Sequence, residues 1–190
     1  MNGKIIIVEG YLASGKSTFA RRLSKELTIP YLIKDTFKIA ICASVQITNR
    51  EEGGQFSAVT FDAIMYVTER FMETGLPVII EGNFVPSGMK KVDEAGVIKA
   101  LIEKYGYQSL TFKFKGDTRI LHERYVEREK TPERGDANRD FCETPFDVFD
   151  RYCNDLDAFN VGGKVIPVDT TDFDKVDFSY YIEQARVFVT

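Results

Sequence analysis

The segment IIIVEGYLASGKSTFARRL, residues 5–23, constrains the fold more than any other part of the chain. A run of β-branched residues leads to Gly10, a short loop runs to Gly15, and apolar residues with helical spacing follow. The two glycines let the backbone curl so that successive N–H groups point inward, and the start of a helix adds partial positive charge. The segment therefore predicts a strand, an anion-binding loop and a helix in direct succession.

The loop also carries side chains that suit one kind of anion. It fits the pattern G-x-x-x-x-G-K-[ST], in which Lys16 reaches the β- and γ-phosphates and the Ser17 hydroxyl ligates Mg²⁺. Thr18 either contacts the α-phosphate or fills the first helical turn. The pattern predicts a bound nucleoside triphosphate with magnesium, held by Gly10, Ala13, Ser14, Gly15, Lys16, Ser17 and Thr18.

Strand-like and helix-like patterns alternate along the chain. Five β-rich runs lie at residues 4–9, 31–34, 77–82, 110–115 and 164–169. The runs 4–9 and 77–82 are almost continuously apolar, which is typical of central strands in a parallel sheet, whereas 110–115 alternates and is expected nearer an edge. Helical patterns cover residues 16–27, 56–72, 93–106, 145–159 and 174–189. This alternation predicts a three-layer α/β fold, with helices on both faces of the sheet.

Length and composition limit the function classes. With 190 residues, of which 44% are hydrophobic, the chain suits a single domain over 1–190. Its net charge of −4 gives no general attraction to an anionic membrane or to nucleic acid, although it does not exclude nucleic acid. Cys42, Cys142 and Cys153 lack disulfide or zinc spacing, and no apolar run nears the ~20 residues that span a bilayer. We therefore expect a cytoplasmic protein with free thiols.

One segment, residues 118–140, breaks the alternation. Charged residues of both signs dominate it, and Pro132 and Gly135 interrupt its helical pattern. Arg124 and Arg128 are four residues apart and fall on one helical face. Composition alone is equally compatible with a solvated helix followed by a loop. The only histidine of the chain, His122, has no visible partner and is interpreted as a surface residue.

The segment after the last strand narrows the choice of nucleotide base. A GTP-binding switch protein would carry N/T-K-x-D there, whereas this chain has PVDTTDFD. Adenine is therefore the favoured base. The chain is also too short for the extra domains of large ATPase machines, so a small-molecule kinase fits its size best.

Together these motifs resemble a known family. The loop GYLASGKST, the strands in YLIKDTF and PVIIEGNF, the arginine-rich TRILHERYVERE and the late VIPVDTT are similar, in this order, to P-loop kinases of the nucleoside monophosphate kinase group. The nearest likeness is to the AAA_33 subfamily, with zeta toxin-like, polynucleotide kinase-like and antibiotic phosphotransferase-like kinases. The resemblance implies the P-loop NTPase fold, a five-stranded parallel sheet of order 2-3-1-4-5, a mobile helical lid at 118–140, and transfer of the ATP γ-phosphate to an acceptor hydroxyl.

The resemblance also implies roles for residues at two strand ends. Asp35 would accept the proton of the acceptor hydroxyl, since ligands of such folds bind beyond the carboxyl ends of the strands. The same residue is equally suited to cap the following helix. Glu81 would hold a water of the Mg²⁺ shell or contact the acceptor. Asn83 would hydrogen-bond the acceptor or serve a turn.

Transition-state and adenine-binding roles follow from the same resemblance. Arg124 and Arg128 of the lid would stabilise the negative charge of the transferred phosphoryl group, together with Lys16. Arg134 and Arg139 rank behind them. A salt-bridged helix is the alternative, because each arginine has acidic neighbours. The loop that would line the adenine, or form a simple capped turn, consists of Asp169, Thr170 and Thr171.

The acceptor pocket is expected from residues 36–62 and from NFVPSGMKK, which follows the third strand. Acidic residues outnumber basic ones in the region 36–75, which disfavours an already phosphorylated acceptor and favours a neutral hydroxylated molecule. The predicted acceptor contacts are Asp35, Phe37, Lys38, Glu81 and Asn83.

Two alternatives to a small-molecule kinase stay open. The first is a polynucleotide 5′-hydroxyl kinase, in which Arg50, Lys90 and Lys91 would converge beside the acceptor site to form a basic channel. The second is a nucleotide-binding regulatory or toxin-like module, whose partner would be a protein or a cell-wall sugar.

Overall fold

The computed structural model describes residues 3–47, 49–86, 93–132 and 144–190. Five parallel strands form one sheet in the order β2-β3-β1-β4-β5, which confirms both the α/β fold and the predicted strand order. The strands are β1 (Lys4–Gly10), β2 (Tyr31–Ile33), β3 (Val78–Glu81), β4 (Gln108–Lys115) and β5 (Lys164–Asp169).

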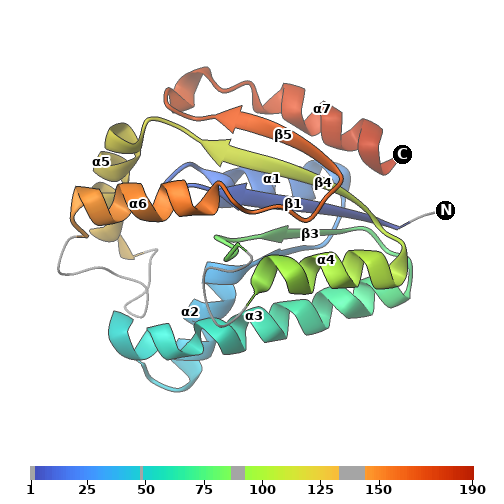
Figure 1. Ribbon diagram of the computed structural model, residues 1–190, viewed down its shortest axis with the longest axis horizontal. Helices are drawn as coiled ribbons and strands as arrows, with labels where there is room; N and C mark the ends of the chain where they lie inside the picture. The colour runs from blue at the N-terminus through green and yellow to red at the C-terminus, as the bar shows by residue number, and fades with distance from the viewer. Residues whose placement is uncertain (1–2, 48, 87–92, 133–143) are drawn as a thin grey trace.

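Helices connect the strands and cover both faces of the sheet (Figure 1). In chain order they are α1 (Lys16–Leu27), α2 (Lys34–Ser44), α3 (Arg50–Glu73), α4 (Glu94–Tyr105), α5 (Thr118–Glu129), α6 (Phe146–Leu156) and α7 (Phe178–Val189), with a short 3₁₀ helix, η2 (Phe173–Lys175). α1 and α7 lie on one face, and α3 and α4 lie on the other. The predicted three-layer arrangement is therefore confirmed.

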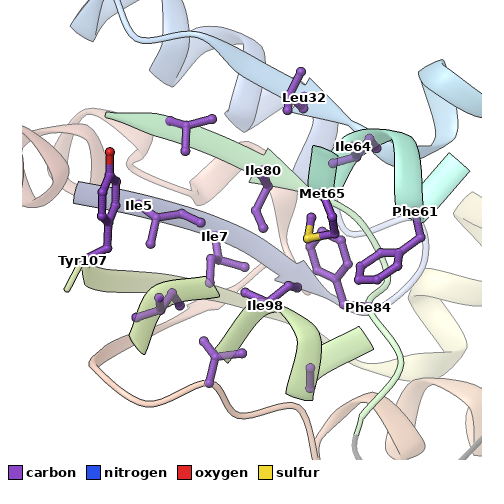
Figure 2. Close-up of a cluster of buried hydrophobic side chains, with 14 of the residues drawn as sticks. Ile5, Ile7, Leu32, Phe61, Ile64, Met65, Ile80, Phe84, Ile98 and Tyr107 are labelled. Carbon is purple, nitrogen blue, oxygen red and sulfur yellow. The ribbon is translucent and has the colours of Figure 1, made fainter. Parts of the chain in front are cut away.

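The central strand β1 contributes to the apolar core on both of its faces. Ile5 and Ile7 join one cluster with residues of α3 and α4, and Ile6 and Val8 join a second cluster with residues of α1 and α7. All four side chains are at most 1% exposed. Figure 2 shows the first cluster, in which Phe84 lies beside Phe61, with ring centres 6.3 Å apart. A strand that is buried on both faces needs apolar residues at every position, which explains the continuous apolar run.

Strand β4 lies next to the edge strand β5 and is therefore nearer an edge than β1, as its alternating sequence indicated. It is not itself an edge strand, because it pairs with β1 on one side and with β5 on the other. The alternation arises from Thr111, Lys113 and Lys115, and the side chain of Lys113 is only 12% exposed. Its Nζ donates to the carbonyls of Asp157 (2.8 Å) and Phe159 (3.2 Å), and it lies 3.5 Å from a carboxylate oxygen of Glu9.

Two helices begin earlier than their sequence patterns indicated. α2 begins at Lys34 with Ile33 as its N-cap, so Asp35 lies inside the first turn and does not cap the helix. α3 begins at residue 50, before the predicted pattern at 56–72, because the side chain of Asn49 caps it by accepting from the N–H of Glu52 at 2.9 Å. Its apolar spacing starts later, where the helix reaches the core.

The carboxyl ends of the strands gather the segments that carry chemical side chains. In Figure 1 the strand arrowheads point toward the end of the molecule where α5 and α6 lie. The β1–α1 loop, the start of α2 and the segments after β3, β4 and β5 all begin at this edge.

Two compositional expectations can be compared with the structure. Cys42 and Cys153 are free thiols, and both are buried; Cys142 lies outside the described residues. Among the described residues, no helix combines the length and the apolar character that a membrane crossing requires.

Candidate active site

The loop between β1 and α1 has the backbone shape that the glycine pattern predicted. Gly10 has a φ of +127°, and a Cβ at this position would lie 2.0 Å from the carbonyl oxygen of Phe114. The same oxygen accepts from the N–H of Tyr11 at 2.8 Å. Gly15 has a φ of +87°, and a Cβ there would lie 2.2 Å from the ring of Phe173. Backbone conformation and close packing therefore both require glycine at these two positions.

Lys16 is buried at the start of α1, inside the curl of the loop. Its Nζ donates to the carbonyl of Tyr11 at 2.5 Å, and the Ser14 hydroxyl donates to the same oxygen at 2.7 Å. Burial lowers the pKa of Lys16, and the nearby carboxylate of Glu81 opposes this shift. The ammonium therefore lies where the sequence pattern expects the phosphates of a nucleotide.

Ser17 and Glu81 meet beside the loop. The Ser17 hydroxyl donates to Oε2 of Glu81 at 2.8 Å, and Glu81 ends β3, the strand next to β1. Burial raises the pKa of Glu81 to about 7, against the lowering effect of Lys16. Among the residues that the structure describes, no three His, Cys, Asp or Glu side chains form a metal cluster. A hydroxyl and one carboxylate nevertheless fit Mg²⁺, which keeps several waters and takes its other ligands from substrate phosphates.

A cavity of about 560 Å³ opens over this loop, and we call it the phosphate cavity. The predicted site residues that line it are Ala13, Ser14, Gly15, Lys16, Ser17, Thr18, Asp35, Glu81, Asn83, Arg124 and Arg128. Gly10 is not among its lining residues and shapes the turn behind it. Arg21 of α1 adds a cation that the sequence analysis missed. Its spacing of four residues from Ser17 was an available signal, because such residues share a helix face.

The two arginines of α5 both reach the phosphate cavity, but their contacts differ. Arg124 is held by the loop after β5, because Nη1 donates to the carbonyl of Thr170 (2.5 Å) and Nη2 to that of Thr171 (2.7 Å). Burial lowers the pKa of Lys16, and the positive charge of Arg128 lowers it further. Arg128 lines the phosphate cavity together with the loop residues, whereas Arg124 also joins α5 to the end of the sheet.

The loop after β5 is held by hydrogen bonds of its own. Thr170 is fully buried, and its hydroxyl donates to the carbonyl of Lys115 at 3.0 Å. The hydroxyl of Thr171 accepts from the N–H of Asp117 at 2.8 Å, and the carboxylate of Asp169 accepts from the N–H of Thr171 at 2.8 Å. The Thr170 side chain thus supports the turn and is not placed to contact a base. Asp169 and Thr171 line a separate surface cavity of about 410 Å³.

A second cavity, of about 450 Å³, adjoins the first, and we call it the acceptor-side cavity. It is lined by Lys34, Asp35, Lys38, Gly54, Gln55, Ser57, Ala58, Thr60, Asn83, Val85, Glu94 and Tyr152. Asp35 and Asn83 line both cavities, so the two spaces meet at these residues. The structure therefore brings Asp35, Lys38 and Asn83 together as predicted acceptor contacts, and Glu81 lies on the phosphate side.

Phe37 does not join them. It packs against the apolar cluster between the sheet and helices α3 and α4, whereas Asp35 and Lys38 line the acceptor-side cavity. Successive residues of a helix point about 100° apart, so the helical phase that turns Asp35 and Lys38 toward the cavity turns Phe37 toward the core.

A buried ion pair in the acceptor-side cavity was missed in the sequence. Nζ of Lys34 contacts both carboxylate oxygens of Glu94, at 2.5 and 2.7 Å, and Glu94 also accepts from the N–H of Val85 at 2.8 Å. The ammonium lies 5.5 Å from the ring centre of Phe61 and 5.8 Å from that of Phe84. No sequence pattern connects residues 34 and 94, because only the packing of α4 against the sheet brings them together.

Tyr152 of α6 is a second residue that sequence reasoning missed. It lines the acceptor-side cavity together with Asn83, Asp35 and Glu94. Burial raises the pKa of Tyr152, and the negative charges of Asp35 and Glu94 raise it further. The side chain thus reaches the junction of the two cavities from α6.

The interpretation of His122 as a surface residue is wrong. The side chain is half-buried, with Nε2 2.8 Å from the carbonyl oxygen of Thr144. Its ring packs edge-to-face against Phe149 and Phe146 of α6, with ring centres 5.1 and 5.6 Å away. The histidine therefore belongs to the contact between α5 and α6.

Glu9 is a buried carboxylate that directly precedes the phosphate loop. It is 0% exposed, and neither of its carboxylate oxygens has a hydrogen-bond partner among the described residues. The closest cation is Lys113, at 3.5 Å. Burial raises the pKa of Glu9 to about 7, against the lowering effects of Lys113 and Lys16.

Several predicted cations lie outside the described residues. These are Lys90, Lys91, Arg134 and Arg139, together with the part of the predicted lid beyond residue 132. The side chain of Arg50 also lies outside them. The basic channel that a polynucleotide kinase would need therefore stays a prediction.

Known proteins share this architecture. The family described as an AAA domain, AAA_33, matches residues 5–152. A protein of Chloroflexus aurantiacus j-10-fl described as a "putative kinase" is 21% identical over 100% of both chains, with a TM-score of 0.87. A sugar kinase from Janibacter sp. HTCC2649 is 16% identical, covering 97% of this chain and 93% of that chain, with a TM-score of 0.58. A shikimate kinase from Aquifex aeolicus vf5 is 14% identical, covering 96% and 94%, with a TM-score of 0.57.

These similarities carry different weight. No curated protein is significantly similar in sequence to the chain. At identities of 14–21%, the similar structures establish the fold alone, whereas the family match extends over most of the chain and includes the phosphate loop and Asp35. The chain belongs to the AAA_33 family of AAA domains, and its fold is that of the small P-loop kinases.

Proposed function

We propose that this protein is a kinase that transfers the γ-phosphate of ATP to a hydroxyl group of a small molecule. The observation that carries the proposal is the junction of the two cavities at Asp35 and Asn83. A phosphate donor in one cavity and a hydroxyl acceptor in the other would meet beside a carboxylate, which is the arrangement that direct transfer requires. The kinase names of the similar structures support the same reading of the fold.

The reaction needs one bond to form and one to break. The acceptor oxygen bonds to the γ-phosphorus, while the bond from this phosphorus to the bridging oxygen of the β-phosphate breaks and ADP leaves. The proton of the acceptor hydroxyl passes to the carboxylate of Asp35, which acts as general base. Positioning of the two substrates and stabilisation of charge supply most of the rate enhancement in such reactions.

Three cations of the phosphate cavity suit that stabilisation. Lys16 lies within the loop, and Arg21 and Arg128 line the cavity from α1 and α5. Arg124 positions α5 through its two hydrogen bonds to the loop after β5. When Mg²⁺ binds beside Ser17 and Glu81, it supplies further positive charge to the phosphate oxygens.

The choice of ATP rests on the base-binding segment. The chain lacks the guanine-specific N/T-K-x-D after its last strand, where it carries Asp169 and two threonines. The hydrogen bonds of Asp169 and Thr171 hold this loop beside Arg124. The adenine would lie against this loop.

A transfer assay tests the proposal directly. The protein is incubated with Mg²⁺, ATP labelled at the γ-phosphate and a metabolite extract, and labelled products are separated from ATP and phosphate. Lys16→Ala should abolish product formation, and Asp35→Asn should reduce it by ~10²-fold. Asp62→Asn, on the exposed side of α3, is the matched control and should retain activity. Full activity of Lys16→Ala, or the absence of any labelled product while ATP binds, would contradict the proposal.

A further inference from the structure

The charged side chains of the acceptor-side cavity balance one another. Lys34 and Lys38 line it, and so do Asp35 and Glu94. Arginine, the residue that suits bidentate binding of a phosphate or carboxylate, is absent from the described lining. The described part of this cavity therefore carries no excess positive charge for an anionic acceptor.

The ammonium of Lys34 is already engaged. It contacts both oxygens of the Glu94 carboxylate at 2.5 and 2.7 Å and lies over the rings of Phe61 and Phe84. An anionic ligand that captured this ammonium would leave Glu94, whose side chain is 5% exposed, without its partner, which is strongly unfavourable. The Lys34–Glu94 pair therefore acts toward a ligand as a polar wall without net charge.

Groups that bind hydroxyls lie next to this pair. Tyr152 lines the same cavity as Asn83, Asp35 and Glu94. A phenol both donates and accepts, a carboxylate accepts, and an amide does both from separate atoms. Helix α3 adds Gln55, Ser57 and Thr60 to the lining. The hydroxyls of a polyol, each of which donates and accepts, complement such a set.

We propose that the acceptor is an uncharged compound with several hydroxyl groups, of the size of a sugar or a cyclitol, and that Tyr152 and Glu94 select it. One hydroxyl lies at Asp35 and receives the phosphoryl group, while neighbouring hydroxyls bind Tyr152 and Glu94. A carboxylate or phosphate on the acceptor is repelled by Asp35, and the Lys34–Glu94 pair offers it no net positive charge in return. The cavity volume of about 450 Å³ is in the usual range for small-molecule sites. This inference rests on the proposed function and names the substrate class of the same site.

The first test compares neutral and anionic compounds with the same skeleton. The pairs are D-glucose with D-gluconate, D-ribose with D-ribonate, and myo-inositol with myo-inositol 1-phosphate. Their dissociation constants are measured by calorimetry on the protein saturated with Mg²⁺ and the non-hydrolysable ATP analogue AMP-PNP. Within the pairs that bind, the neutral member should bind at least about tenfold more tightly. Tighter binding of an anionic member, or no binding of any neutral member at concentrations on the order of 10 mM, would overturn the inference.

The same titrations separate this inference from the proposed function. AMP-PNP with Mg²⁺ is titrated into the protein first. If the nucleotide analogue does not bind, the proposed function fails. If it binds and the neutral compounds do not, only the polyol inference fails.

Two variants test the selecting residues. Tyr152→Phe removes one hydroxyl and should weaken binding of the neutral member about tenfold, with unchanged affinity for AMP-PNP. Tyr66→Phe, an exposed tyrosine on α3, is the matched control and should bind both ligands normally. A purely structural role of Tyr152 would instead lower the melting temperature and weaken both members of a pair equally, and that result would remove Tyr152 from the proposal.

Glu94→Gln tests selection by charge. Glutamine keeps the shape of the side chain but leaves the Lys34 charge uncompensated, so the preference for the neutral member over the anionic one should fall about tenfold or more. An unchanged preference, in a variant that still binds AMP-PNP and unfolds cooperatively, would contradict the role of Glu94.

Discussion

Two buried lysine–glutamate pairs of this protein are built very differently. In the acceptor-side cavity, Lys34 contacts both oxygens of Glu94, which also accepts a backbone hydrogen bond from Val85. In the sheet, Lys113 lies 3.5 Å from Glu9, too far for a good hydrogen bond, and donates instead to two backbone carbonyls. Both glutamates are almost inaccessible to water, but only Glu94 has its oxygens satisfied within the described residues.

The difference shows that a neighbouring lysine is not sufficient to keep a buried carboxylate charged. Burial raises the pKa of Glu9 to about 7 even though Lys113 and Lys16 both oppose the shift. Neither carboxylate oxygen of Glu9 has a hydrogen-bond partner among the described residues, and the attraction of the two lysines does not offset the loss of hydration. Glu9 is therefore a source of pH-dependent stability.

Among these substitutions, breaking the Lys34–Glu94 pair should change the free energy of unfolding most. Glu94→Ala leaves the Lys34 ammonium buried without its partner and should lower the free energy of unfolding by about 3–5 kcal/mol, measured by urea denaturation. The double variant Lys34→Met/Glu94→Leu, which removes both charges, should recover most of this loss. A double variant as unstable as the single one would show that packing, and not the unpaired charge, sets the loss.

Neutralising Glu9 should raise the free energy of unfolding, in contrast to Glu94→Ala, and the size of the increase should depend on pH. The pKa of Glu9 is about 7 in the folded protein and 4.5 in the unfolded chain, so the folded state binds the proton more tightly and stability falls as pH rises from 4.5 to 7. Glu9→Gln removes this loss and should raise the free energy of unfolding by about 3 kcal/mol at pH 8, with little change near pH 4.5.

Urea denaturation of both proteins at pH 5 and pH 8 measures this effect. Glu81, whose pKa burial also raises to about 7, retains its own pH dependence in both proteins and so cancels in the difference. An equal change at the two pH values would show that Glu9 does not titrate in this range.

Removing Lys113, the cation of the Glu9–Lys113 pair, should lower the free energy of unfolding by an intermediate amount. Lys113→Met deprives the carbonyls of Asp157 and Phe159 of a donor and should lower the free energy of unfolding by about 1–2 kcal/mol at pH 6. The loss should be larger at pH 8, where Glu9 is ionised and would have lost its nearest cation. Thermal unfolding at the two pH values, with wild-type protein alongside, tests whether the penalty grows with pH as expected.

Breaking a solvent-exposed ion pair should change the free energy of unfolding least. Lys99 and Glu103 of α4 lie 3.9 Å apart with side chains 55% and 68% exposed. Lys99→Ala should change the free energy of unfolding by less than about 0.5 kcal/mol, because water and salt screen such a pair. A larger change in urea denaturation would mean that helix α4 responds to substitution for reasons other than this pair.

The phosphate side of the site was predictable because its parts are contiguous in the chain. Residues 10–18 form the loop by themselves, and an acid that closely follows a strand, such as Asp35 after β2, must lie near it once the strand order is known. The acceptor side combines side chains from α2, α3, α4 and α6 with residues after β3. Glu94 and Tyr152 carry no local pattern, and they acquire a role only from the way separate helices pack.

The pairing of Glu9 with Lys113 was indicated by the sequence, although it was not predicted. Glu9 interrupts an otherwise apolar central strand, and Lys113 interrupts another, so their pairing across adjacent strands could have been predicted. Other features had no such signal. The burial of Thr170 depends on its hydroxyl reaching the end of β4, which nothing in VDTTD indicates.

Two adjacent residues of helix α6, Tyr152 and Cys153, contact different parts of the site. Cys153 packs with Tyr11 of the phosphate loop and Leu121 of α5, while Tyr152 faces the acceptor-side cavity. Helix α6 thus contributes both to the packing behind the phosphate loop and to the wall of the acceptor-side cavity. Under the proposed function, a substitution at Cys153 should therefore change the kinetics toward both the nucleotide and the acceptor.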